Sequence, residues 1–226
     1  MSLNQILAIS ETVGINDQRF VGQVLSRNQR LSTSEVLTVV PFAFTLKPMN
    51  YLYYSQNRDL LASLRYYDKA LTQYLNFGAT DWVNYIYYQG NMNSGQIAAC
   101  QWQTSSANKN LVLGNLPSIS GSSYIVRAGD FCQVGLYTYI ATEDVTRGAS
   151  STVNIPVHRN LLTPVVSPTV CVIGQYGTTV SMGGSTYTGV TFPVILRDYP
   201  TYTLVPITND SFISWSGAFV AMEVVL

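Results

Sequence analysis

The stretch from Arg127 to Leu161 contains the side chains whose types could carry chemistry. It holds His158, the only histidine of the chain, together with Asp130, Cys132, Glu143 and Asp144. A histidine beside a carboxylate can activate a nucleophile, two carboxylates can hydrolyse a glycosidic bond, and cysteine with histidine can bind zinc. Which of these reactions is available depends on the elements that position the groups.

Strand alternation separates His158 from the residue beside it. The segment 151–159 has the composition of a strand, and successive side chains of a strand point to opposite faces. His158 then shares a face with Asn154 and Pro156, whereas Arg159 lies on the opposite, aliphatic face. No Gly-x-Ser-x-Gly motif accompanies the histidine, and a single histidine excludes a site with several histidine ligands. We therefore expect His158 and Arg159 to be packing or contact residues.

The three acidic residues of this stretch fit turns better than catalysis. Asp130 follows Gly129, a pair typical of a turn before a strand. Glu143 and Asp144 are neighbours at a strand end and point to opposite faces, and Arg147 is close enough in sequence for a local salt bridge. The sequence therefore predicts no catalytic, cofactor-binding or metal-binding residue, and no enzymatic activity.

The three cysteines form no recognisable framework. Cys100, Cys132 and Cys171 are odd in number and widely spaced, and the chain has no Cys-x-x-Cys motif. This spacing indicates neither a zinc site nor a set of disulfides. We expect three buried free thiols.

Tyrosines are abundant in the first half of the chain and allow two interpretations. They could stack on sugars, or they could lie at the seam between a helix and a sheet and at protein interfaces, which we favour. The residues concerned are Tyr51, Tyr53, Tyr54, Tyr66, Tyr67, Tyr85, Tyr87 and Tyr88.

Charge is the most unusual feature of the composition. Charged residues make up 11% of the 226 residues and sum to a net charge of +0, against about 25% in typical soluble domains. A neutral chain has no field to attract it to nucleic acid, and no apolar run reaches the roughly 18 residues of a membrane span. A surface with so few charges is suited to a protein whose faces are covered by copies of itself or by partners.

The elements predicted around these residues are mainly strands. We expect a first β-sandwich or barrel over residues 1–115, with one packed helix over about 57–76, where apolar residues follow a helical spacing. Ser55 or Asn57 could cap this helix. A turn-rich break over 116–123 precedes a second, smaller all-β barrel or sandwich over 123–226, where short strands recur about every 10 residues.

Several segments resemble structural proteins of long-tailed bacteriophages, from the baseplate and tail-tube region. The resemblance rests on "ISETVGINDQRFVGQVLSRNQR", "AGDFCQVGLYTYIATEDVTRGASSTVNIPVHR", "YPTYTLVP" and "FVAMEVVL", with the pairs Gly129-Asp130, Asp144-Val145, Arg147-Gly148 and His158-Arg159. It implies a non-enzymatic virion protein at a distal-tail, tube-initiator or hub position, made in the host cytoplasm. Its partners would be itself, as a ring of three or six copies, and other tail or baseplate proteins. The resemblance brings no catalytic residue and no cofactor.

Four residues are candidates for the contacts of such an assembly. Arg27 and Arg30 lie in the polar loop "LSRNQRLSTS", and His158 and Arg159 lie at a predicted strand end. Ring subunits pair exposed strand edges and loops with their neighbours. The alternative is a receptor- or glycan-binding module of a tail fibre or of the baseplate periphery, in which exposed tyrosines would contact sugar.

Overall fold

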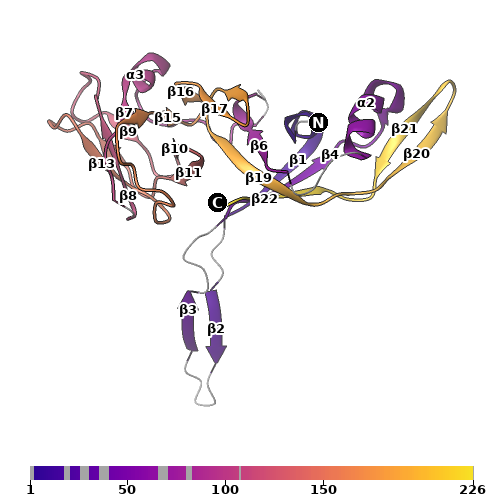
Figure 1. Cartoon of the computed structure of the whole chain (residues 1–226), viewed down its shortest axis with the longest axis horizontal. Coiled ribbons are helices and arrows are strands. Elements are labelled where there is room, and N and C mark those ends of the chain that lie inside the picture. The colour runs from indigo at the N-terminus through magenta and orange to yellow at the C-terminus, as the bar shows by residue number, and fades with distance from the viewer. Residues whose placement is uncertain are drawn as a thin grey trace.

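A computed structural model describes residues 3–17, 21–25, 31–35, 41–65, 71–79, 83–106 and 108–225 (Figure 1). The fold is mainly β, with 44% strand and 13% helix, which confirms the predicted fold class. The strands form several curled antiparallel sheets, including a half-barrel. Besides the predicted helix, the described part of the chain contains two short ones.

A five-stranded antiparallel sheet at the centre of the molecule joins the two ends of the described chain (Figure 1). We call it the central sheet, and its strand order is β1-β4-β22-β19-β6. Its strands are β1 (Ser10–Asn16), β4 (Ala43–Pro48), β6 (Gln73–Asn76), β19 (Thr191–Asp198) and β22 (Phe219–Glu223). Helix α1 (Leu3–Ala8) packs against it through Leu3, Ile6 and Leu7, whose spacing places all three on one helix face.

Residues 88–177, which we call the inserted lobe, lie between the early and late strands of the central sheet in the sequence. One sheet has the order β13-β8-β7-β14, a second has the order β11-β10-β15-β16, and β9 pairs with β12. The strands are β7 (Gln101–Trp102), β8 (Asn110–Gly114), β9 (Tyr124–Val126), β10 (Phe131–Val134), β11 (Tyr137–Ile140), β12 (Val145–Thr146), β13 (Val153–Pro156), β14 (Thr169–Val170), β15 (Val172–Ile173) and β16 (Tyr176–Gly177). Helix α3 (Ser94–Ala99) begins with a capping box between Asn93 and Gln96.

Strands β10 and β15 contribute to two hydrophobic cores at once. Phe131 and Val172 belong to the core of the central sheet, whereas Cys132 and Ile173 belong to the core of the inserted lobe. This division follows from the alternation of side chains along a strand. The two cores therefore share one sheet as a common layer.

Two hairpins extend from this body (Figure 1). Among the described residues, strands β2 (Val21–Leu25) and β3 (Leu31–Glu35) pair only with each other. At one end of the long axis, β20 (Tyr202–Ile207), β21 (Asp210–Trp215) and β5 (Leu52–Tyr53) form a three-stranded sheet beside helix α2 (Tyr54–Arg65) (Figure 1). We call this sheet the arm. The remaining elements are the hairpin of β17 (Val180–Met182) and β18 (Ser185–Tyr187) and the 3-10 turn Phe77–Ala79.

The helix predicted over 57–76 is wrong at its C-terminal end. Helix α2 ends at Arg65, residues 66–70 lie outside the described part, and 73–76 form strand β6. Asn76 explains the difference, because its side-chain amide donates to Thr191 Oγ1 at 2.7 Å and β6 pairs with β19. This tertiary pairing overrides the helical spacing of the apolar residues. The predicted caps Ser55 and Asn57 lie inside α2, and the Ser55 hydroxyl donates to Asp210 instead.

Strand pairing crosses the boundary predicted between residues 115 and 123. β8 pairs with β13 across it, and the late strands β19 and β22 pair with the early strands β6 and β4. The hydrophobic cores accordingly combine residues 3–86 with residues 190–221 in one core. The second core draws its residues from the middle of the chain.

Candidate functional site

Arg159 lies at the seam between the inserted lobe and the central sheet, as half of a buried ion pair. Its guanidinium donates from Nη1 to Glu223 Oε2 at 2.7 Å and from Nη2 to Glu223 Oε1 at 2.6 Å, and Nη2 also donates to the Thr138 carbonyl at 2.7 Å. The rings of Phe42 and Tyr139 lie 5.2 and 5.3 Å from the guanidinium carbon. Arg159 is only 1% exposed, so within this chain it holds two layers together and presents no surface to a partner.

Glu223 reaches this seam from the last strand of the central sheet. Besides the guanidinium, its Oε2 accepts the Phe42 backbone N–H at 3.1 Å. The Glu223 backbone N–H donates in turn to the Phe42 carbonyl at 2.7 Å. A buried carboxylate with this set of donors is fully engaged, and it leaves no oxygen directed to a substrate.

His158 is held by the backbone of the strand beside it. The ring Nδ1 of His158 accepts the backbone N–H of Ile140 at 3.0 Å, and the backbone N–H of His158 donates to the Ile140 carbonyl at 3.0 Å. The imidazole also packs against Phe42, with ring centroids 5.5 Å apart. Because the Nδ1 lone pair already accepts a hydrogen bond, that nitrogen is not available as a base. The geometry describes a packing residue.

Two of the three acidic residues, Asp130 and Asp144, accept backbone N–H groups of the same turn, those of Arg127 and Ala128. Asp130 is buried, and its carboxylate accepts the N–H groups of Arg127 and Gln89, both at 2.8 Å. Burial raises the pKa of this carboxyl group, and the two hydrogen bonds oppose that rise. Asp144 accepts the Ala128 N–H at 2.9 Å, and Glu143 is exposed. Arg147 donates to the Pro117 carbonyl at 2.8 Å, so a turn contact takes the place of the expected local salt bridge.

The three cysteines are free and buried, as the sequence predicts. Burial raises the pKa of the Cys100 thiol to about 11, and it also raises the pKa values of Cys132 and Cys171. The thiolate is the reactive form of cysteine. Among the described residues, no group of three or more His, Cys, Asp or Glu side chains could hold a metal ion.

Thiol reactivity tests this environment directly. We expect the native protein to show almost no reaction with a thiol-specific chromogenic disulfide at pH 8, because the thiols are both buried and protonated. After denaturation in urea, all three cysteines should react within the mixing time. The urea sample is the control for total thiol, and prompt labelling of even one cysteine in the native protein would contradict the expectation.

The tyrosines that suggested a sugar site do not form one cluster. Tyr88 is buried and its hydroxyl donates to the Ile125 carbonyl at 2.6 Å, and Tyr85 packs on Phe131. Tyr66 and Tyr67 lie outside the described residues. Tyr51 and Tyr53, in contrast, lie on the arm and are 68% and 44% exposed.

These two tyrosines belong to an apolar row on one face of the arm. Strand register places Val205 opposite Phe212, and Phe212 opposite Tyr53. The ring of Phe212 also contacts Tyr51, with centroids 5.9 Å apart. We call Tyr51, Tyr53, Val205 and Phe212 the arm face. Val205 is 44% exposed.

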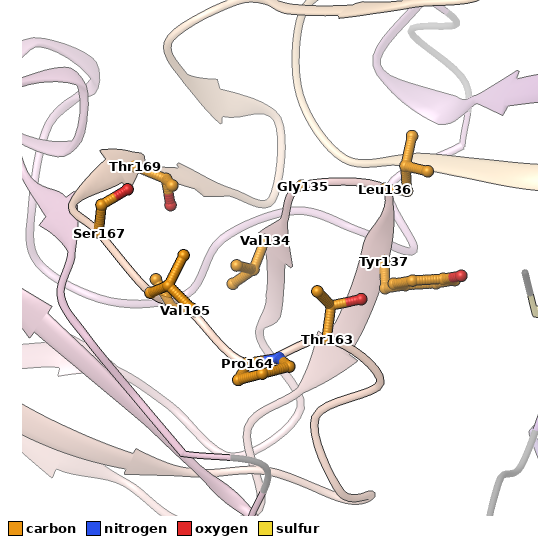
Figure 2. Close-up of a pocket in the computed structure, with 10 residues that line it drawn as sticks. Val134, Gly135, Leu136, Tyr137, Thr163, Pro164, Val165, Ser167 and Thr169 are labelled. Atoms are coloured by element: carbon orange, nitrogen blue, oxygen red, sulfur yellow. The ribbon is translucent and has the colours of Figure 1, made fainter.

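A second apolar surface lies in the inserted lobe (Figure 2). It is a groove of about 410 Å³ between the β10–β11 turn and the loop before β14. None of the residues that line it is charged; they are Val134, Gly135, Leu136, Tyr137, Thr163, Pro164, Val165, Val166, Ser167 and Thr169. We call it the loop groove. Its volume lies in the range of natural binding pockets, but its lining contains no titratable group other than a tyrosine.

The sequence predicts only some of the residues that form these sites. Arg27 and Arg30, predicted as contact residues, lie outside the described part of the chain. Glu223 was missed, although a single acid inside the apolar run "FVAMEVVL" is a signal for a buried partner of opposite charge. The loop groove has no sequence signature, because two separate loops create it.

Comparison with known proteins adds no assignment. No family model matches the chain, and no curated protein matches it. In the described part of the chain, no helix is long and apolar enough to cross a membrane.

Proposed function

We propose that the chain is a non-enzymatic structural protein of a bacteriophage virion, which assembles with copies of itself and with other tail or baseplate proteins. The observation that carries the proposal is the arm face, where Tyr51, Tyr53 and Val205 are exposed beside the half-buried ring of Phe212. Exposed aromatic residues are typical of protein interfaces. The resemblance of "AGDFCQVGLYTYIATEDVTRGASSTVNIPVHR" to phage tail proteins suggests the assembly.

The shape and the charge of the chain support an assembly role. The β2–β3 hairpin stands away from the body (Figure 1) and pairs with no other strand in the part of the chain that the structure describes. An isolated two-stranded hairpin is only marginally stable in water, so a partner would stabilise it. The net charge of +0 also removes the repulsion that keeps identical chains apart.

Sedimentation velocity of the pure protein tests this proposal. At micromolar to tens of micromolar concentration we expect a discrete oligomer, and electron microscopy of that sample should show a closed ring of three or six copies. A tail or baseplate fraction purified from phage particles should contain the chain. A monomer at every concentration, both alone and mixed with tail proteins, would overturn the proposal.

A glycan-binding role is the second candidate, because Tyr51 and Tyr53 present exposed rings. Sugars stack on aromatic faces beside polar groups, and the hydroxyls of Ser55 and Tyr54 are nearby in the sequence. A glycan array distinguishes the two roles. Binding that is lost in Tyr51→Ala and Tyr53→Ala, with no oligomer in solution, would favour the receptor-binding role.

A further inference from the structure

We propose that the arm face of one copy docks into the loop groove of a second copy, in a head-to-tail contact. This inference rests on the proposed self-assembly and names the two surfaces that make it.

Strand register shows which face of the arm is free. Leu204, Ile213 and Leu52 lie opposite one another on the three strands. Ile213 is fully buried, and Tyr202, on the same face of β20 as Leu204, lines a pocket with Arg58 and Leu61 of α2; Leu204 itself is 43% exposed. Side chains alternate along each strand. The next row, Val205 with Phe212 and Tyr53, therefore points away from α2 and forms an apolar ridge.

The loop groove is a concave match for such a ridge. Figure 2 shows the turn with Gly135 on one side of the groove, and the loop with Pro164 and Val165 on the other. In the loop, the apolar side chain of Val166 is 82% exposed to solvent. A volume of about 410 Å³ accommodates a few apolar side chains but not a folded domain.

Charge favours the same pairing. Neither the arm face nor the lining of the loop groove contains a charged side chain. Their mutual burial would leave no charge without a partner, and burying an unpaired charge is costly. A partner with a charged docking segment would lose that advantage, whereas a second copy of this chain supplies an uncharged ridge.

The two surfaces lie toward opposite ends of the long axis of the molecule (Figure 1). The inserted lobe occupies one end, and strands β20 and β21 occupy the other. They therefore meet only between copies. A contact between two different patches is heterologous, and it closes into a ring or continues as a filament.

Complementation between two charged variants tests this contact. Val205→Asp places a charge on the arm face, and Val166→Asp places one beside the groove. Each variant alone should raise the Kd of self-association on the order of 100-fold, because a carboxylate would be buried without a partner. An equimolar mixture should form 1:1 dimers, since one intact groove and one intact arm face remain between the two chains.

Controls keep the outcomes distinct. Leu71→Asp changes an exposed residue that belongs to neither surface, and it should assemble like the wild type. Leu136→Asp is a second groove variant, and thermal denaturation verifies that each variant is folded. If both variants block assembly but their mixture stays monomeric, the two surfaces do not dock into each other and the inference is wrong. If neither variant affects an oligomer that the wild type forms, the inference fails and the proposed function stands. A monomeric wild type would overturn both.

Discussion

Arg159→Met is expected to lower the free energy of unfolding by about 3–5 kcal/mol, because it leaves Glu223 buried without a counter-charge. Both side chains of this pair are almost inaccessible, with 1% and 0% of their surfaces exposed. Water therefore cannot solvate the carboxylate that remains. Urea denaturation followed by intrinsic fluorescence measures the change.

The double variant separates the ion pair from the packing around it. Arg159→Met with Glu223→Leu removes both charges and keeps an apolar volume between Phe42 and Tyr139. We expect it to recover most of the loss, to within about 1–2 kcal/mol of the wild type. Arg197→Met is the matched control, since that arginine is 70% exposed and its pairing with Asp198 contributes little. A single variant as stable as the double one would contradict this account.

Phe192→Ala is the second change with a large expected effect. The Phe192 ring is completely buried, and it contacts the rings of Phe42, Phe44, Phe77 and Phe131 at centroid distances of 4.9–6.1 Å. Its removal would leave a cavity where the central sheet meets the shared layer. We expect a loss of about 3–5 kcal/mol in the free energy of unfolding.

The comparison for this variant is the same substitution at a half-buried ring. Phe212→Ala removes a phenyl group from the arm, where solvent can replace most of the lost contacts, and we expect it to cost less than half as much. Chemical denaturation at a concentration below self-association measures both variants. Equal losses at the two positions would show that the aromatic cluster around Phe192 is not the centre of the fold.

Local pattern in the sequence predicts much of the inserted lobe. Alternation along 151–159 places Ile155 and Val157 in the core together with Arg159, and the structure buries all three. Turn chemistry likewise accounts for Asp130, whose carboxylate accepts backbone N–H groups. These features depend on neighbours within a few residues, and so they can be read from one segment at a time.

Features that depend on pairing between segments far apart in the sequence cannot be predicted from a local sequence pattern. The spacing around 71–76 is helical, but β6 forms because β19, more than 100 residues later, offers it a partner. Glu223 becomes part of a site only when β22 lies beside β4. The arm face likewise requires the register of three strands, one of them from the first quarter of the chain.

The placement of the inserted lobe within the central sheet has a consequence for the order of folding during synthesis. Every strand of the inserted lobe precedes residue 178. In contrast, β4 can pair with β22, and β6 with β19, only after those late strands have been synthesised. While the ribosome makes the segment between them, the early strands present unpaired edges and an open apolar face. Apart from the β2–β3 hairpin, the lobe is thus the first part of the described chain in which every strand has its partner, and the Arg159–Glu223 contact is among the last to form. A chain of this design needs protection from aggregation during translation more than after it.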